Sequence, residues 1–540
     1  SDPWIQGLGW RLPAGIGVAA LLWRWRERID ALAARPAVRR TVGTLALGTV
    51  WLAALQTPWN VVDTNHMLYT SDELLAPAAG RWPLVDYLPQ YSNLLGIPLA
   101  ALAPIVRLAP VHAAVVASVL LVAMTLWIFL RVIRERGSSG SGWAVVAAAV
   151  AWPAFSNGFF VGGERALGAL NSGAMRPLLP LLVGLLIGGM LRPVDRGRAA
   201  LLGALAGTAA LANVDFGAPA LLAAFAATAI VSLAGGDGPA GATARLGAVA
   251  TGAVVGVAVL LGLIGVLGGG RPRPLLGALT ALTYSRFGWF DVAMPVYGPH
   301  SLVGVLFLAS AGLGILRLTR ASGAATTDAR RRATAIRAVY FGLLGVGVLP
   351  YYAGRSLTPV LVIGYAFLIG TCAACVLTLT ANRLAWVALV GAGLAAWTFV
   401  PQPFQSLGRL AGSGTGETHD MVRVVDLGRR AAEAIAGASE LAPGAEVGIV
   451  ASSGNSLALE TGLTNAVLAS NAAFITLGDY WTALQCEHLS TTGLDVVLVE
   501  DPAVAEALRT NAECADALDQ ASARLLSTGW TAIDLRPDGR

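Results

Sequence analysis

One short polar stretch carries side chains that can do acid–base chemistry in a chain that is otherwise strongly apolar. It reads "VVDTNHMLYTSDELLAPAAGRWPLVDYLPQYSN" and runs from Val61 to Asn93. A carboxylate that is partly removed from water, and within hydrogen-bond reach of a hydroxyl, can accept its proton during nucleophilic attack. The stretch therefore predicts a general base, unless it is only a solvated loop whose aromatic residues suit a membrane surface. Its carboxylates are Asp63, Asp72, Glu73 and Asp86.

The composition predicts the elements that must position this stretch. Of 540 residues, 55% are hydrophobic and 13% are charged, whereas a soluble globular protein has about 25% charged residues. Mean hydropathy is +0.65, and apolar runs of about 17–25 residues recur along the chain. We therefore expect a polytopic α-helical membrane protein. The net charge of +5 fits arginines that anchor cytoplasmic loops, and we expect no nucleic-acid partner.

The apolar runs predict about eleven transmembrane helices between residues 41 and 401. Residues 1–40 have an Arg/Trp-rich face and no small-residue cleavage site, which favours an interfacial or partly embedded helix. The eleven expected spans are 41–58, 112–130, 142–154, 178–191, 199–212, 217–234, 244–268, 301–317, 338–352, 357–378 and 384–401.

Arginine placement predicts the orientation of these helices. Arginines cluster before the first span and after the second, between the fourth and fifth, in the loop "RLTRASGAATTDARRRATAIR", and between the last two. All these loops fall on one side if the spans alternate, and that side is expected to be cytoplasmic. The long first external loop, residues 59–111, and the tail after residue 401 then lie outside, in a bacterial plasma membrane.

The tail, residues 402–540, predicts a small extracytoplasmic α/β domain. "AEVGIVASS", "LDVVLVEDP" and "WTAIDLRP" are typical of short strands. "DMVRVVDLGRRAAEAIAGA" and "DPAVAEALRTNAECADALDQASARLL" have the pattern of amphipathic helices. Cys486 and Cys514 fall in this domain, on the oxidising side of the membrane. The sequence therefore leaves two alternatives, a disulfide between them or two free thiols.

The loop motif and the topology together resemble the GT-C glycosyltransferase superfamily. "DE" at Asp72 and Glu73, followed by "APAAGRWPLVDYLPQYSNLLG", is similar to that family's acidic pair, small-residue helical turn and "G-x-W/Y-P-x-x-D". "DTNH", from Asp63 to His66, matches a second version in which the acid lies closer to the first helix. The resemblance covers the topology of the whole chain and about thirty residues at motif level.

The resemblance implies a mechanism and a pair of substrates. An acceptor hydroxyl would attack the anomeric carbon of a polyprenyl-phosphate sugar while a carboxylate takes the proton, with inversion. Asp63 is the first choice for the base because its place at the helix end best resembles the family's acid, and Asp72 is the second. The expected partners are this lipid donor, a glycan acceptor and membrane lipid. Arabinofuranose is the favoured sugar and mannose the next, on a cell-envelope glycan.

The leaving phosphate needs cationic or hydrogen-bonding partners on the external face. A guanidinium can hold a phosphate in bidentate fashion, and an arginine at this surface can equally be an interfacial anchor. Asp215 is either a helix cap or a functional residue that contacts substrate or binds a metal ion together with Glu164. The sequence does not decide whether a divalent cation is needed. The candidates for the phosphate are Arg355, Arg176, Arg286 and His300. The candidates for other substrate contacts are His66, Glu73, Glu164, Asp215, Tyr91 and Trp289.

The alternative function is a transporter or flippase of a lipid-linked sugar. Transporters place ionisable groups near the bilayer midplane and often contain inverted repeats. Here the acids are expected at the outer boundary, and the sequence shows no convincing internal repeat. We therefore favour the transferase.

Overall fold

The structure, a computed structural model, describes the greater part of the helical region and portions of the tail. Alongside isolated positions, the described ranges are 3–25, 72–89, 94–106, 110–134, 160–161, 164–165, 175–191, 195–236, 238–279, 299–321, 329–353, 358–380, 444–451, 454–461, 463–467, 486–489, 496–500, 502–510, 522–525 and 530–535. They group into two compact units, and each unit is described by itself. The first contains residues 1–62, 119–259 and 285–414, and the second contains residues 63–118, 260–284 and 415–540.

Apolar helices dominate the first unit. Val214–Ala234, Gly238–Gly268, His300–Arg320 and Arg331–Tyr352 are long and apolar enough to cross a membrane. The chain is therefore a helical membrane protein. The helices of this region are α1 (Pro3–Arg24), α6 (Pro110–Arg134), α8 (Leu178–Met190), α9 (Arg196–Ala212), α10 (Val214–Ala234), α11 (Gly238–Gly268), α13 (Pro299–Ala321), α14 (Ala329–Ala353) and α15 (Thr358–Thr380).

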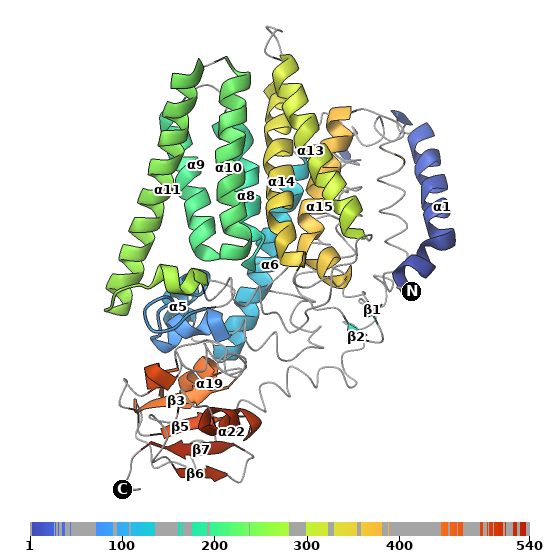
Figure 1. Cartoon of the computed structure of the whole chain (residues 1–540). Helices are drawn as coiled ribbons and strands as arrows, with labels where there is room; N and C mark the ends of the chain where they lie inside the picture. The colour runs from blue at the N-terminus through green and yellow to red at the C-terminus, as the bar shows by residue number, and fades with distance from the viewer. Residues whose placement is uncertain are drawn as a thin grey trace. The chain divides into compact units, whose positions relative to one another are not determined.

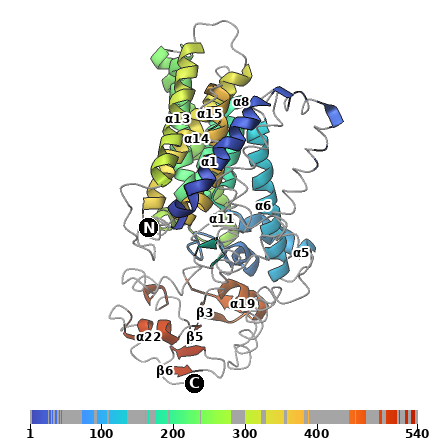
Figure 2. The same ribbon diagram turned by 90° about the vertical axis from the view of Figure 1, so that its right-hand side faces the viewer.

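Helix α14 lies at the centre of the packing in this unit. It contacts α8, α10, α13 and α15, and Figures 1 and 2 both show α13, α14 and α15 side by side. Gly342 allows α14 to approach α13 closely, because a Cβ there would lie 2.6 Å from backbone atoms of Phe307 and Ala311. Small residues commonly permit such close approach between membrane helices.

Side-chain caps fix where two of these helices begin. The Asp195 carboxylate accepts a hydrogen bond from the Gly197 amide (2.9 Å) at the start of α9. The Asn213 side chain accepts one from the Phe216 amide (3.0 Å) at the start of α10. Both are N-cap contacts that satisfy an otherwise unpaired amide of the first turn. The cap at Asn213 also places Asp215 in the first turn of α10.

The second unit contains a mixed five-stranded sheet with strand order β4-β3-β5-β7-β6. The strand β3 pairs in parallel with β4 and β5, whereas β7 pairs antiparallel with β5 and β6. Two hydrophobic clusters lie on the sheet, one with Val504 and Leu508 of α22 and the other with Leu457 of α19. The elements are β3 (Glu446–Val450), α19 (Gly454–Thr461), β4 (Thr464–Asn465), β5 (Val496–Val499), α22 (Pro502–Thr510), β6 (Ser522–Leu525) and β7 (Thr531–Asp534).

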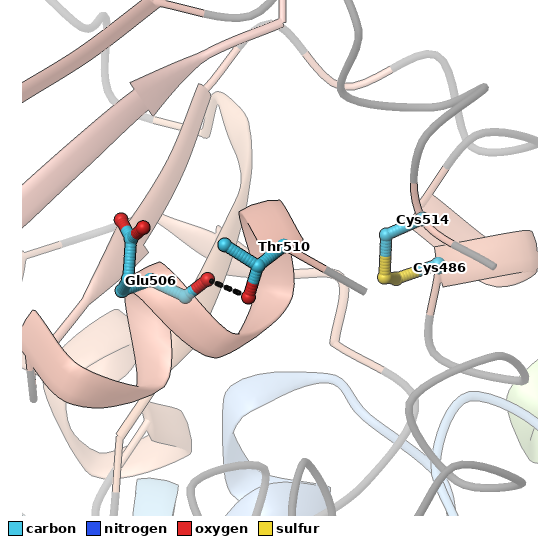
Figure 3. Close-up of a disulfide and its surroundings, with 4 residues drawn as sticks. All are labelled: Cys486, Glu506, Thr510 and Cys514. Atoms are coloured by element: carbon cyan, nitrogen blue, oxygen red, sulfur yellow. Dashed lines mark hydrogen bonds between the residues drawn. A yellow bond between two sulfur atoms is a disulfide. The ribbon is translucent and has the colours of Figure 1, made fainter. Parts of the chain in front are cut away.

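Cys486 and Cys514 form a disulfide within this unit, which decides between the two alternatives left open by the sequence (Figure 3). Their Cα atoms lie 5.1 Å apart, and both side chains are buried in the hydrophobic cluster that includes Leu508 of α22. Close to the bridge, the Thr510 hydroxyl donates to the Glu506 carbonyl of the same helix (2.9 Å). The bridge therefore joins residues 486–489 to the segment that follows α22.

Most of the predicted elements coincide with described ones. Eight of the eleven expected apolar spans fall on helices α6, α8–α11 and α13–α15, while 41–58, 142–154 and 384–401 lie outside the described residues apart from isolated positions. The three expected strands fall on β3, β5 and β7. The expected helix over residues 501–526 is wrong at its end, because residues 522–525 form β6 and pair with β7. Pairing with a neighbouring strand overrides the local helical pattern there.

Candidate functional site

The acidic pair lies in a tightly folded segment of the second unit. Residues 72–75 are helical and continue into a short 3₁₀ helix, η2 (Ala76–Ala79). Gly80, with φ +79°, reverses the chain, and the Arg81 amide donates to the Ala76 carbonyl (2.9 Å). Asp72 and Glu73 are 0% and 1% exposed. Two carboxylates at this depth need compensating charges or hydrogen bonds.

Arg81 supplies a positive charge beside this pair. The residue is 2% exposed, and its guanidinium donates to the Asp86 carbonyl (3.0 Å) and lies over the Tyr87 ring at 5.3 Å. It also donates to the carbonyl of Val467. Burial lowers the pKa of Arg81 to about 10, and the electrostatic interactions with Tyr87, Asp72 and Asp86 oppose this decrease. The guanidinium is therefore still charged at neutral pH.

Tyr87 and Asp86 complete the turn that follows. The Tyr87 hydroxyl donates to the Glu73 carbonyl (3.3 Å), and the Trp82 amide donates to the Asp86 carboxylate (2.6 Å). Burial raises the pKa of Tyr87 well above its usual value, and the charge of Glu73 raises it further. The phenol thus stays protonated and remains a hydrogen-bond donor.

Two other segments of the chain pack against this turn within the same unit. The Arg273 amide donates to the Leu84 carbonyl (2.8 Å), and its guanidinium donates to the Val85 carbonyl (2.7 Å). From the sheet side, helix α19 contacts η2. The His488 imidazole donates from Nε2 to the carbonyl of Ala466 (2.8 Å). The loop that carries the acidic pair is therefore packed against Arg273, helix α19 and the carbonyl of Val467.

A second polar group lies in the first unit. Arg176, just before α8, forms an ion pair with Asp215 in the first turn of α10 (3.7 Å), and the two side chains are 5% and 6% exposed. The Arg176 guanidinium also lies over the Tyr351 ring at 4.7 Å. The structure thus brings together a predicted phosphate ligand and a predicted substrate ligand. Asp215 partly neutralises Arg176, which retains an aromatic partner on another side.

Several aromatic side chains pack against one another near this ion pair. Phe216 packs against Tyr351 and Tyr365, with ring centroids 6.2 and 6.1 Å apart. His300, in the first turn of α13, lies against the Tyr352 ring at 5.6 Å. Its Nδ1 is buried and makes no hydrogen bond within the described part of the chain. An imidazole in this position can donate to an anion or to a hydroxyl.

The remaining predicted site residues cannot be placed in either group. Glu164 lies in the two-residue strand β2 (Glu164–Arg165), which pairs with β1 (Phe160–Val161). Among residues 72–89, 175–279, 299–380 and the described tail, taken with their gaps, no three His, Cys, Asp or Glu side chains form a group able to hold a metal ion. The predictions that lie outside the described residues are Asp63, His66, Tyr91, Arg286, Trp289 and Arg355.

The sequence did not point to Arg81 or Arg273. Arg81 stands inside the quoted motif, in "GRWPLVD", and Arg273 stands in "GGGRPRP" at the end of an expected span. A single arginine in an interfacial loop has the same pattern whether it is exposed or buried. The only local sign for Arg81 is its place eight residues after the acidic pair.

Comparison with known proteins finds similarity to solved structures. No protein-family profile and no curated protein sequence matches the chain. Among solved structures, the chain is similar to ArnT from Cupriavidus metallidurans, in a crystal structure with bound undecaprenyl phosphate. The match covers 93% of this chain and 98% of ArnT, with 14% sequence identity and a TM-score of 0.41. A likeness at this level carries no inference about activity, which has to come from the residues of this chain.

Proposed function

We propose that the chain is a membrane-embedded, inverting glycosyltransferase of the GT-C type. It transfers a sugar from a polyprenyl-phosphate donor to a cell-envelope glycan on the outer face of the membrane. Arabinofuranose is the favoured sugar and mannose the next. The proposal joins the helical membrane region to the loop motif of Asp72 and Glu73.

The burial of the acidic pair is the observation that carries this proposal. A chain with only 13% charged residues places two adjacent carboxylates at 0% and 1% exposure, beside a buried arginine. Burying charges is costly, and titratable groups with such surroundings cluster at functional sites. The segments around the pair, residues 63–118, 260–284 and 415–540, form one unit. They include most of the first long loop and of the tail, which the arginine pattern assigns to the outer face, and this supports an outward-facing site.

The proposed reaction is a single displacement. The acceptor hydroxyl oxygen forms a bond to the anomeric carbon, while the bond from that carbon to the phosphate oxygen breaks. The lipid phosphate leaves with the electron pair, and a carboxylate takes the hydroxyl proton. Asp63 and Asp72 both remain candidates for that carboxylate, and Asp72 is the one whose surroundings are described.

The leaving phosphate gains charge and needs stabilisation. Arg176 is the described candidate, because its buried guanidinium lies close to an aromatic ring and to a carboxylate. Asp215 would hold this guanidinium in place and would compete with phosphate for it. His300 offers a further hydrogen bond from a buried nitrogen. Arg355 and Arg286 stay in the proposal as predictions from the sequence.

A transfer assay with matched acid variants tests the proposal. Purified protein, a radiolabelled polyprenyl-phosphate arabinofuranose or mannose, and an oligosaccharide acceptor should give an extended, anomerically inverted product. Asp72→Asn or Asp63→Asn, whichever removes the base, should lower kcat by about 10²- to 10⁴-fold. Glu506→Gln is the control, since this carboxylate is 64% exposed on α22.

Two outcomes would contradict the assignment. Full activity in both aspartate variants would remove the base from this stretch. Movement of labelled lipid across vesicle membranes, without consumption of the donor, would favour the transporter.

A further inference from the structure

Arg81 makes contacts to two parts of the second unit that lie far apart in the sequence. On one side it faces its own loop through the Asp86 carbonyl and the Tyr87 ring. On the other side it donates to the carbonyl of Val467, 386 residues further along the chain. One buried side chain thus links the acidic segment to the C-terminal sheet.

The point that Arg81 reaches on the sheet is firmly held. Val467 follows β4, and its side chain is fully buried in a hydrophobic cluster. The Asn465 side-chain oxygen accepts hydrogen bonds from the amides of Ile449 (2.9 Å) and Val467 (3.2 Å). This ties the residues around Val467 to the neighbouring strand β3. A group bonded to this carbonyl therefore shares the rigidity of the sheet.

The charge of Arg81 acts on the acidic segment as well. Its electrostatic partners are Tyr87, Asp72 and Asp86, and Tyr87 in turn faces Glu73. Arg273 and His488 belong to the other segments that pack here. The charges of Arg273 and Arg81 both lower the pKa of the His488 imidazole. Among these groups, Arg81 provides the buried positive charge that attracts Asp72. An opposite charge favours the ionised form of a carboxylate, which is the form that accepts a proton.

We propose that Arg81 is a positioning residue that fixes the acidic pair to the C-terminal sheet and keeps Asp72 ready to act as a base. This inference rests on the proposed function, with Asp72 as the base. It also gives the C-terminal domain a role in the reaction, because loosening the sheet around Val467 would loosen the acidic segment. Arg81 itself need not touch substrate.

Three variants separate the charge of Arg81 from its hydrogen bonds. Arg81→Met removes both and keeps a long side chain. Arg81→Lys keeps the charge but loses the planar set of donors that lets one side chain reach carbonyls on two sides. Arg271→Ala is the control, because Arg271 is an exposed arginine of the same unit.

Hydrogen exchange measures the mechanical link independently of activity. In Arg81→Met and Arg81→Lys, amides in residues 72–88 and 463–467 should exchange about two- to tenfold faster, as expected for the loss of a hydrogen bond. Arg271→Ala should leave both segments unchanged. Unchanged exchange at 463–467 in both Arg81 variants would overturn the link.

The pH profile of transfer tests the electrostatic part. Without the positive charge, the base should have a higher pKa, so the acid limb of kcat/KM in Arg81→Met should move up by about one pH unit. Arg81→Lys keeps the charge and should show the same acid limb of kcat/KM as the unaltered protein. If Arg81→Met does not fold, the acid limb of Arg81→Lys alone tests the electrostatic part of the proposal. A fall in activity with an unmoved limb in Arg81→Met, or a moved limb in Arg81→Lys, would reduce Arg81 to a purely structural residue. Absence of transfer by the unaltered protein would contradict the proposed function, while the exchange result would still support or overturn the link.

Discussion

Each unit contains a pair of opposite charges that has been taken out of water. Asp72 faces Arg81 in the second unit, and Arg176 faces Asp215 in the first. Such pairs are costly to assemble, but they are more costly to break, because one buried charge is then left without its counterpart. Both can therefore serve as fixed points around which a reactive group is oriented.

The Arg176–Asp215 pair allows a direct test of this cost. Arg176→Gln or Asp215→Asn should each lower the free energy of unfolding by about 3–5 kcal/mol, since either leaves a buried charge. The double variant should lose less than the sum of the two. Unfolding of the detergent-solubilised protein is the measurement.

An exposed ion pair provides the matched control for that experiment. Arg198 lies 3.3 Å from Asp195, and the side chains are 54% and 53% exposed. Exposed pairs contribute about 0–1 kcal/mol, so Arg198→Gln should have little effect. Strictly additive losses in the Arg176/Asp215 cycle would show that the two side chains are not coupled.

His488 should make the stability of the second unit depend on pH. Burial lowers its pKa, as do the charges of Arg273 and Arg81, and the hydrogen bond to Ala466 opposes the decrease only in part. The unfolded chain keeps a histidine pKa of about 6.5. Below about pH 6.5 the unfolded state therefore binds a proton before the folded state does, and stability falls until the lower, folded pKa is passed. Above about pH 6.5 the imidazole is neutral in both states and does not change the stability.

Thermal unfolding of the unaltered protein and of His488→Gln, at about pH 7.5 and about pH 5.5, measures this contribution. The decrease in Tm on acidification should be smaller in His488→Gln. An equal decrease in both proteins would assign the acid sensitivity to other groups.

Among the elements, the α13–α14 contact depends on the absence of a side chain. A Cβ on Gly342 would lie 2.6 Å from the Phe307 carbonyl oxygen and the Ala311 amide nitrogen. Gly342→Ala should separate the helices and cost about 1–3 kcal/mol, the usual range for overpacking. Gly312→Ala, on α13, is the control, because no atom lies within 4 Å of the added Cβ. It should be neutral or slightly stabilising, since Ala favours helix over Gly.

The Cys486–Cys514 disulfide is a further link that stabilises the domain containing the five-stranded sheet. It joins residues separated by 28 positions, and closing a loop of this length contributes about 3–4 kcal/mol in the chain-entropy description. The double variant Cys486→Ser/Cys514→Ser should lose stability by this amount in chemical unfolding. Mass analysis of tail peptides before and after reduction should show the bridge, and an unchanged mass would contradict it.

The elements were more predictable from the sequence than the site was. Apolar runs located α8–α11 and α13–α15 because membrane helices carry their signal in local composition. The strand β6 was missed because its conformation depends on pairing with β7 rather than on its own residues. In the site, the acidic pair could be identified, but the contacts of Val85 with Arg273 and of Arg81 with Val467 join residues that are 188 and 386 positions apart. Local patterns contain no information about such contacts.

At the scale of the whole molecule, the arginine pattern of the sequence and the packing in the structure both concern the same three segments. The arginine pattern assigns the first long loop, the region after α11 and the tail to one side of the membrane. In the structure, residues 63–118, 260–284 and 415–540 form one compact unit. Loops that pack together in one compact unit at the ends of membrane helices are expected to emerge on the same face. The packing thus supports the topology proposed from the sequence.

Cysteine labelling in intact cells tests that topology. Glu506→Cys places a thiol on an exposed position of α22, and Arg198→Cys places one on an exposed position near the start of α9. A membrane-impermeant maleimide should label Glu506→Cys in intact cells, and Arg198→Cys only after the membrane is opened. Background should be low, because Cys486 and Cys514 are paired and Cys372 and Cys375 are buried. Labelling of both positions from outside, or of Arg198→Cys alone, would contradict the orientation and would put the acidic pair on the wrong side for an external glycan.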